Sequence, residues 1–211
     1  MIVGIFLFGG VAVAGPVILP VANSTYTLYN SESVVIPWMD IGYVQIGGGT
    51  LLFDISGLAG STIADATLNF YVRDTVNSPF PSQMDIRDIN TPIGTLLTDY
   101  YSNEPPVNQI WNDIYSGTLY ASVSIQSGAQ QYSVALYPSA IADLQSAIAG
   151  GSQYFIVGLS SDVSSAAWWE IHTAVGTNNL TVTTAVPEPT TMLLFGTGLL
   201  GLWGARRKFK K

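Results

Sequence analysis

A strand-like alternation of apolar and polar residues restricts the fold of this chain more than any other feature. Between residues 66 and 73, Ala66, Leu68, Phe70 and Val72 fall on one face and Thr67, Asn69, Tyr71 and Arg73 on the other. The run from Thr118 to Ile125 alternates in the same way through Leu119, Ala121, Val123 and Ile125. A period of two is that of a strand with one buried face.

Shorter segments of strand-like composition continue along the chain, separated by glycine, proline, serine and asparagine. The predicted strands are Tyr26–Tyr29, Ser33–Ile36, Tyr43–Ile46, Thr50–Ile55, Met84–Ile89, Gln131–Leu136, Gln153–Leu159, Ala166–His172 and Leu180–Thr184. The predicted turns are Gly47–Gly49, Ser78–Pro79, Asn90–Pro92 and Gly150–Gly151. Many short strands with such turns predict an all-β fold, a single antiparallel β-sandwich of jelly-roll type.

Two short helices are expected to interrupt the strands. Apolar residues recur with helical spacing at Val107, Ile110, Trp111, Ile114 and Tyr115, directly after Pro105-Pro106. A second helical pattern runs through Ile141, Leu144 and Ile148, with Ser139 as the expected N-cap and Gly150-Gly151 as the stop. We expect both helices to cap open ends of the sandwich.

The distribution of charge limits the partners of this domain. Between Gly15 and Ala185 only Arg73 and Arg87 are basic, against 13 of the 14 acidic residues of the chain. Such a surface lacks the basic footprint that nucleic acid requires and is repelled by anionic lipid. Calcium or a neutral polymer is a more natural partner than a phosphate. The absence of cysteine excludes disulfides and thiol catalysis, so the domain depends on its apolar core.

The first 14 residues have the length and composition of a signal peptide. They are almost entirely apolar, and Ala12-Val13-Ala14 fits the small-x-small pattern that precedes a cleavage site, here between Ala14 and Gly15. No Lys or Arg precedes the apolar run, so either the α-amino group alone provides the positive charge or translation starts further upstream. The alternative is a buried N-terminal strand.

The last 26 residues contain three chemically different segments in a fixed order. Pro187-Glu188-Pro189 forms an extended strap because proline fixes φ and restricts the residue before it. Residues 190–205 are uncharged and are expected to form a transmembrane helix that is short for a bilayer core of about 30 Å. The basic stop-transfer tail, residues 206–211, then contains Arg206, Arg207, Lys208, Lys210 and Lys211.

This ordered trio resembles the PEP-CTERM sorting signal of bacterial envelope and biofilm proteins. The resemblance implies an exosortase-type membrane enzyme as partner, which recognises the strap and removes the helix and the tail. The chain is then exported, held transiently in the inner membrane, and delivered to the cell surface or the extracellular matrix. The alternative is a single-pass anchor that is never cut.

The chain therefore divides into a signal peptide (residues 1–14), a β-sandwich ectodomain (15–185) and a sorting signal (186–211). Within the ectodomain, Leu51–Leu58 and Thr62–Leu68 are similar to the opening of DNRLRE-type domains, with Asn179–Thr183 as the closing segment. That resemblance implies an extracellular β-sandwich, and some of those domains bind carbohydrate. Leu52 replaces the charged residue usual in the middle of the first motif, so any role of that charge does not carry over.

The segment Trp168–His172 is the candidate ligand-binding site. In a strand, Trp168, Glu170 and His172 share one face, where an indole ring stacks on a sugar and the polar groups bind its hydroxyls. The alternative is that Trp168 is structural and lies under a loop such as Val76–Ser82.

Motifs for catalysis and metal binding are missing from the sequence. The chain contains no G-x-S-x-G, P-loop or H-E-x-x-H pattern, and His172 is its one histidine. A hydrolase that uses two of the acids Asp40, Asp54, Asp99 and Glu104 stays open as an alternative. A calcium loop at Asp85–Asn90 is disfavoured because Asp85 and Asp88 point to opposite faces of a strand. Surface pairing of Asp85 with the neighbours of Arg87 is favoured instead.

We therefore expect no catalytic residue, no metal and no cofactor. The sequence predicts an exported, non-catalytic protein of the envelope or exopolysaccharide matrix. The alternatives are a carbohydrate-binding module and a glycan-degrading enzyme.

Overall fold

Antiparallel strands make up most of the computed structural model, which describes residues 12–28, 32–35, 38–42, 47–76, 82–98, 100–101, 105–161, 168–172 and 178–186. The strands are β1 (Ala12–Leu28), β2 (Glu32–Val35), β3 (Trp38–Gly42), β4 (Gly47–Asp54), β5 (Thr62–Val76), β6 (Ser82–Asp88), β7 (Tyr100–Tyr101), β8 (Leu119–Ile125), β9 (Gln130–Ala135), β10 (Tyr154–Ser161), β11 (Trp168–His172) and β12 (Asn179–Val186). The helices are α1 (Ile93–Leu96), α2 (Pro105–Ser116) and α3 (Pro138–Ala149), with a 3₁₀ turn at Ser56–Leu58. The predicted all-β, antiparallel fold is confirmed.

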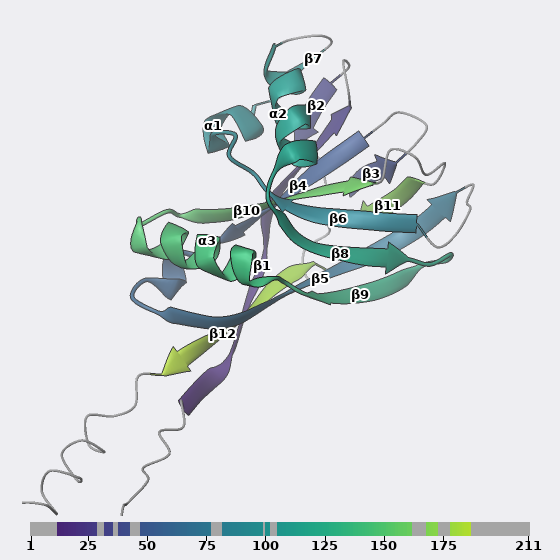
Figure 1. Cartoon of the computed structure of the whole chain (residues 1–211). Coiled ribbons are helices and arrows are strands. Elements are labelled where there is room, and N and C mark those ends of the chain that lie inside the picture. Colours follow the sequence, from purple (N-terminus) through teal and green to yellow (C-terminus); the bar gives the residue numbers. More distant parts are fainter. Residues whose placement is uncertain are drawn as a thin grey trace, which may run out of the picture.

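The strands form one continuous sheet that curves around a core (Figure 1). Its order is β7-β2-β1-β12-β5-β11-β3-β4-β10-β6-β8, with β9 paired to β5 and β1 paired also to β4. Strands β4, β10, β6 and β8 lie on one side of the core, and β5, β12 and β9 on the other.

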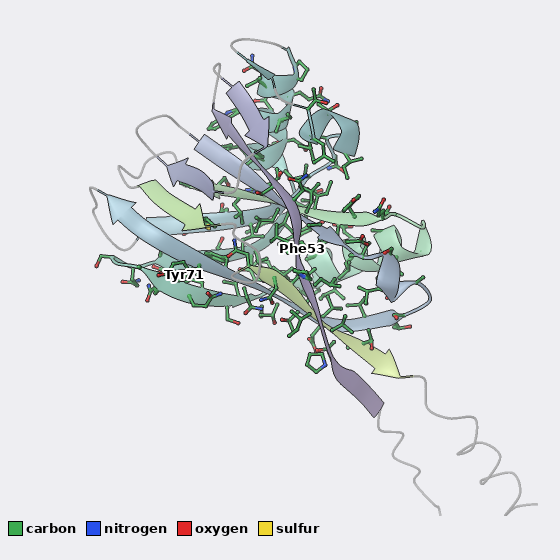
Figure 2. The ribbon with its side chains drawn as sticks, turned by 180° about the vertical axis from the view of Figure 1, so that it is seen from behind. Phe53 and Tyr71 are labelled. Carbon is green, nitrogen blue, oxygen red and sulfur yellow. The ribbon has the colours of Figure 1, made fainter. Side chains whose placement is uncertain are left out.

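The main core lies between these two groups of strands. The alternation predicted for residues 66–73 is confirmed, since Ala66, Leu68, Phe70 and Val72 are all buried. They meet Leu51 and Phe53 of β4, and Phe155 and Val157 of β10. Figure 2 shows Phe53 near the centre of the molecule and Tyr71 near one side of it.

Helix α3 closes one end of the core, as predicted. Ala140, Leu144 and Ile148 are its buried residues, at helical spacing. The predicted N-cap is wrong: Tyr137 occupies that position, and the hydroxyl of Ser139 instead donates to the carbonyl oxygen of Leu119 at 3.0 Å. Gly150 ends the helix and Gly151 follows with a φ of 71°, so the predicted stop is confirmed.

Helix α2 has the predicted residues but covers the outer face of β4, β10 and β6 rather than an open end. Ile110 and Ile114 form a second, smaller core with Leu96 of α1, and Ile156 of β10 packs against it. Strand β10 is therefore covered on both faces, with Phe155 and Val157 in the main core and Ile156 under α2.

The predicted turn at Gly47–Gly49 is wrong, because these residues open strand β4. Gly48 pairs with Thr27 of β1 and with Ser160 of β10. A Cβ at Gly48 would lie 2.9 Å from Cγ2 of Ile114, so the missing side chain lets α2 approach the sheet closely. Strand β3 and residues 12–25 of β1 were not predicted as strands, and the predicted strand Tyr43–Ile46 lies outside the described residues.

Candidate functional site

The junction between the folded domain and the C-terminal segment lies at the end of β12. This strand is flanked on both sides: Ala185 is opposite Val13 of β1 and Thr62 of β5. Val186 is opposite Ala12 of β1, and the register with β5 ends at Ala185. The strand therefore leads directly into Pro187, the first residue of the predicted strap.

We call Ala12–Pro20 of β1 together with β12 the terminal strand pair. The beginning of β1 and the end of β12 lie side by side and point away from the helices (Figure 1). The pairing of β1 with β4 begins only at Val21, so within the described residues Ala12–Pro20 pairs with β12 alone. The side chains of Val17 and Ile18, which alternate between the two faces, are 36% and 64% exposed. This part of β1 is therefore only partly covered, whereas Leu180 and Val182 of β12 beside it are fully buried in the main core.

Asn178 fixes the base of the terminal strand pair. It is fully buried, its Oδ1 accepts a 2.9 Å hydrogen bond from the backbone N–H of Tyr71, and its carbonyl oxygen accepts one from Val21 at 3.3 Å. One residue thus joins β1, β5 and the start of β12. Because its side-chain oxygen and its backbone carbonyl oxygen both accept hydrogen bonds, this buried residue holds the three strands in register.

The predicted signal-peptide cleavage site lies within the terminal strand pair. Ala14 and Gly15 fall between the pairs Val13–Ala185 and Pro16–Thr183, where the register of β1 shifts. Gly15 is exposed. The Ala14–Gly15 bond therefore lies in the one irregular step of the described β1–β12 pairing, with regular pairing on both sides of it.

The other residues of the predicted sorting signal lie outside the described residues. These are the strap Pro187–Pro189, the predicted transmembrane helix 190–205 and the basic tail 206–211. Within the part of the chain that the structure describes, no helix is long and apolar enough to cross a membrane.

Strand β11 places the candidate sugar-binding residues in the interior of the sheet, between β3 and β5. Trp168 lies opposite Gly42 and Val76, and His172 opposite Trp38. The side chains of Trp168, Glu170 and His172 lie outside what the structure describes, so the predicted stacking on a sugar ring stays a prediction. Ile171 between them is fully buried in the main core.

The register also brings together residues that the sequence keeps far apart. Glu170 lies opposite Asp40 of β3 and opposite Asp74 of β5, so that three acidic residues share one row of three neighbouring strands. The register of β11 with β5 shifts by one residue after Glu170, so that Glu170 lies opposite Asp74 whereas Ile171 lies opposite Val72. No spacing in the sequence reveals such a row, because its members come from three separate strands.

A second candidate site is a polar cavity of about 320 Å³ beside Tyr120, which we call the Tyr120 cavity. Asp88 lines it from the end of β6, Asn90 from the loop that follows, Asp143 from α3 and Tyr154 from β10. Carboxylate oxygens accept hydrogen bonds from hydroxyl groups, and a tyrosine ring offers an apolar face. A cavity of this size with convergent polar groups suits part of a small polar ligand.

Tyr120 lines this cavity and was not predicted as a site residue. It is 2% exposed, its hydroxyl donates to Oδ2 of Asp143 at 2.9 Å, and its ring stacks on Phe155 at 5.8 Å between centroids. Burial raises the pKa of Tyr120 far above its usual value, and the hydrogen bond and negative charge of Asp143 raise that pKa further. The phenol therefore stays neutral and acts as a hydrogen-bond donor.

A bulge explains why the alternation of β8 did not reveal Tyr120. Ile86 lies opposite Ala121 and Arg87 opposite Leu119, so Tyr120 is the extra residue of β8. Both Tyr120 and Ala121 are buried, whereas Leu119 is only partly buried. A bulge breaks the period of two at one residue, and the sequence carries no sign of where it falls.

Asp88 is held in place by one backbone and one side-chain hydrogen bond from the segments that follow it. Its Oδ1 accepts a hydrogen bond from the N–H of Thr118, and its Oδ2 accepts one from Nδ2 of Asn90 at 3.0 Å. On the other side of the Asn90 loop, Oδ2 of Asp113 accepts a 2.8 Å hydrogen bond from the N–H of Asn90. These contacts fix the loop that forms one wall of the Tyr120 cavity.

Asp85 pairs with Arg87 itself, whereas pairing with the neighbours of Arg87 was predicted: Nη2 of Arg87 lies 2.7 Å from Oδ2 of Asp85. Burial raises the pKa of Asp85, but hydrogen bonds from Ser122, Gln83 and Arg87 outweigh it and hold that pKa below its usual value. The carboxylate is thus satisfied by protein donors. Within the described ranges, no group of three His, Asp or Glu side chains forms a metal site.

The acids considered for a hydrolase are not brought together by the described residues. Asp54 accepts hydrogen bonds from the N–H and hydroxyl of Ser56 at 2.9 and 2.6 Å, as in a turn. These hydrogen bonds lower the pKa of the Asp54 carboxyl. Asp40 lies in β3, whereas Asp99 and Glu104 lie outside the described residues.

Comparison with known proteins identifies the C-terminal segment. Residues 185–208 match the PEP-CTERM protein-sorting motif. The predicted resemblance is confirmed, and the motif implies an exported protein that is membrane-associated before an exosortase processes it. The match begins at Ala185, inside β12. No curated protein matches the chain.

Proposed function

We propose that this chain is a non-catalytic component of the bacterial cell envelope or exopolysaccharide matrix, delivered by an exosortase-type enzyme. The observation that carries the proposal is the sorting motif at residues 185–208, which follows a folded strand with no intervening linker. The enzyme would release the β-domain by cutting near Pro187–Pro189, leaving the apolar segment and the basic tail behind.

The chemistry of the domain supports a location outside the cell. It contains no cysteine, so its stability does not depend on disulfides and none can form under oxidising conditions outside the cytoplasm. Its acidic surface suits solubility in a hydrated matrix and disfavours nucleic acid and anionic lipid.

A strap variant tests the sorting step. We expect Pro187→Ala/Glu188→Gln/Pro189→Ala to keep its C-terminal tail and to stay in the membrane fraction. The wild type and the matched control Thr191→Ala are expected to lose the tail and to leave that fraction. Release of the strap variant at the wild-type rate would contradict the proposed role of the strap.

A carbohydrate-binding module is the second candidate function, and the Tyr120 cavity favours it. The two carboxylates of Asp88 and Asp143 accept hydrogen bonds from sugar hydroxyls, and the ring of Tyr154 lines the same cavity. The side chains of Trp168, Glu170 and His172 remain the alternative binding face for the same class of ligand.

Retention on immobilised polysaccharide during electrophoresis tests this candidate. We expect Tyr154→Ala to lose retention if the Tyr120 cavity binds the polymer, and Trp168→Ala to lose it if β11 does. The control is Tyr137→Ala, because Tyr137 is 44% exposed and does not line the cavity. The purified domain is expected to release no reducing ends from the same polymers. Release that depends on Asp88 and Asp143 would instead make the protein a glycan-degrading enzyme.

A further inference from the structure

We propose that the outer edge of strand β9 is an interface for a second copy of this chain. Two β9 strands pair antiparallel in this arrangement, so that the strands β12-β5-β9 of one copy continue into the same three strands of the other. The proposal goes beyond the proposed function, because it concerns the β-domain itself and not its delivery. In Figure 1, β9 lies along the margin of the sheet beside β5.

Strand β9 is an edge strand without the usual protection. In the described part of the chain, β7, β8 and β9 each pair with a single strand. Natural proteins protect such edges with short strands, bulges, prolines or charges. Strand β7 has 2 residues, and β8 carries the bulge at Tyr120, whose carbonyl oxygen accepts a 2.7 Å hydrogen bond from the N–H of Tyr137. Strand β9 keeps a regular register over its 6 residues and contains neither proline nor charge.

The hydrogen-bond pattern shows which backbone groups of β9 face outward. The N–H of Leu136 donates to the carbonyl oxygen of Ala66 at 2.9 Å, so the backbones of these two residues are directed at each other. Antiparallel pairs alternate along a ladder, so Val134 is also directed at β5, whereas the backbone of Ser133 and Ala135 points the other way. The side chains of Ser133 and Ala135 are exposed. Both residues therefore present their N–H and carbonyl groups to an incoming strand.

A two-fold axis through Val134 uses these outward groups. Ser133 of one copy then lies opposite Ala135 of the other, and each such pair exchanges both backbone hydrogen bonds. On the inner face, Val134 lies opposite Val134 of the second copy, and Tyr132 lies opposite Leu136. In the single chain, Tyr132 and Val134 are only partly buried, although they pack against the main core. Pairing therefore removes more of their apolar surface from water.

The charge of the domain favours this edge for self-association. Between Gly15 and Ala185, acidic residues far outnumber the two basic ones, so two copies repel each other over most of their surface. From Ile114 to Ala142 the sequence has no charged residue, and this stretch contains β8 and β9. Pairing of β9 with itself therefore brings no like charges together, and the edge offers no charge that selects a charged partner. The second copy is the partner that this edge fits.

Cysteine cross-linking of the full-length protein tests the pairing, because the chain has no cysteine of its own. The variant Val134→Cys is produced in the native host, treated with an added oxidant and separated by non-reducing electrophoresis. The two copies of residue 134 form a pair without mutual hydrogen bonds, whose Cα atoms lie about 4.5 Å apart, within reach of a disulfide. The two thiols give up two protons, and two electrons pass to the oxidant, as the S–S bond forms. We expect a product of twice the mass, linked through position 134.

Ser133→Cys is the matched control. Ser133 is more exposed than Val134, so random collision would link Ser133→Cys faster. In the proposed register the two copies of residue 133 are diagonal neighbours, about 7–8 Å apart. We expect Val134→Cys to cross-link at least about tenfold faster, since a disulfide does not bridge the diagonal distance without movement of the backbone. Equal rates, or a faster reaction of Ser133→Cys, overturn the proposal.

Two further variants test the role of the edge itself, each combined with Val134→Cys. Ala135→Pro removes an N–H that points away from β5, so the ladder between β5 and β9 stays intact while the pair between copies loses hydrogen bonds. Ser133→Lys places a charge on the edge. We expect cross-linking to slow by about tenfold or more in both variants. Urea unfolding checks that each variant is folded, and unchanged cross-linking in a folded variant overturns the proposal.

The mass of the cross-linked product identifies the partner. A product made of two copies of this chain supports the proposal. A product that contains a different protein shows that another partner occupies the edge and overturns it, and the absence of any product does the same. None of these outcomes affects the proposed delivery, which is read from the mature C-terminus.

Discussion

Substitution of Gly158 tests how closely Ile89, which packs against the smaller core under α2, approaches strand β10. Gly158 lies in β10, opposite Thr50 of β4 and Arg87 of β6, so that it is surrounded by backbone on both sides. A Cβ at this position would lie 2.6 Å from Cδ1 and 3.2 Å from Cγ1 of Ile89, and 3.5 Å from Cα of Ile114. The first distance is well inside the optimum of about 3.5–4.0 Å for two carbon atoms.

We expect Gly158→Ala to lower the free energy of unfolding by about 1–2 kcal/mol. Overpacking of a core costs about 1–3 kcal/mol, and replacing a glycine within a strand by alanine returns about 0.5–1 kcal/mol. The measurement is urea unfolding of the purified β-domain at neutral pH. Gly94→Ala is the control: no heavy atom lies within 4 Å of its Cβ position, and we expect no loss of stability.

A double variant identifies the contact responsible. Ile89→Val removes the Cδ1 atom that the new methyl group would meet. We therefore expect Gly158→Ala/Ile89→Val to be more stable than the sum of the two single changes predicts, by about 0.5–1 kcal/mol. Full stability of Gly158→Ala, or strict additivity in the cycle, would refute the close approach of the Ile89 side chain to Gly158 in β10.

Three further changes test the electrostatics and packing of α2, of β6 and of the turn before β8. Burial raises the pKa of Tyr115 to about 12, so as the pH rises above 10 its phenol ionises in the unfolded state before it does in the folded state. The free energy of unfolding therefore falls between pH 10 and about 12, by about 2–3 kcal/mol at most. Tyr115→Phe is expected to lose less stability over that range in urea unfolding, and an identical loss would contradict the assignment. Folding lowers the pKa of Asp85, so the ionised carboxylate stabilises the fold above the unfolded value near 3.8, and this stabilisation is lost as the pH falls below it. Between pH 5 and pH 2, we therefore expect the free energy of unfolding of Asp85→Asn to decline less steeply than that of the wild type. A Cβ at Gly117 would collide with the backbone carbonyl oxygen of Asp88, so Gly117→Ala is expected to lower the thermal midpoint, by about 4 °C or more, and an unchanged midpoint would refute the contact.

The sequence predicted those parts of the fold in which one face of an element is buried and regular. Leu68 and Phe70 mark the inner face of β5, and Ile110 and Ile114 mark the buried face of α2, because burial on one side selects apolar residues at a fixed period. The sorting signal was predictable for a different reason. Its strap, apolar segment and basic tail are contiguous, so that their order can be read without knowledge of the fold.

The remaining features depend on pairing between distant residues. The first three residues of β1, Ala12–Ala14, belong to the predicted signal peptide, and the pairing of β1 with β12 joins segments far apart in the sequence. Composition predicts a turn at Gly48, but in the structure the missing side chain of Gly48 lets Ile114 of α2 pack closely on the sheet. Tyr120 lies at a bulge, and Glu170 meets Asp40 and Asp74 only through the register of three strands. None of these relations leaves a local pattern.

The mass of the mature C-terminus, measured on protein from native cells and from the culture medium, tests the central claim most directly. The account predicts a chain that ends near Pro187–Pro189, lacks Arg206–Lys211 and is found outside the membrane fraction. A chain that ends at Lys211 and stays with the membrane would contradict delivery by an exosortase and would make this protein an anchored ectodomain.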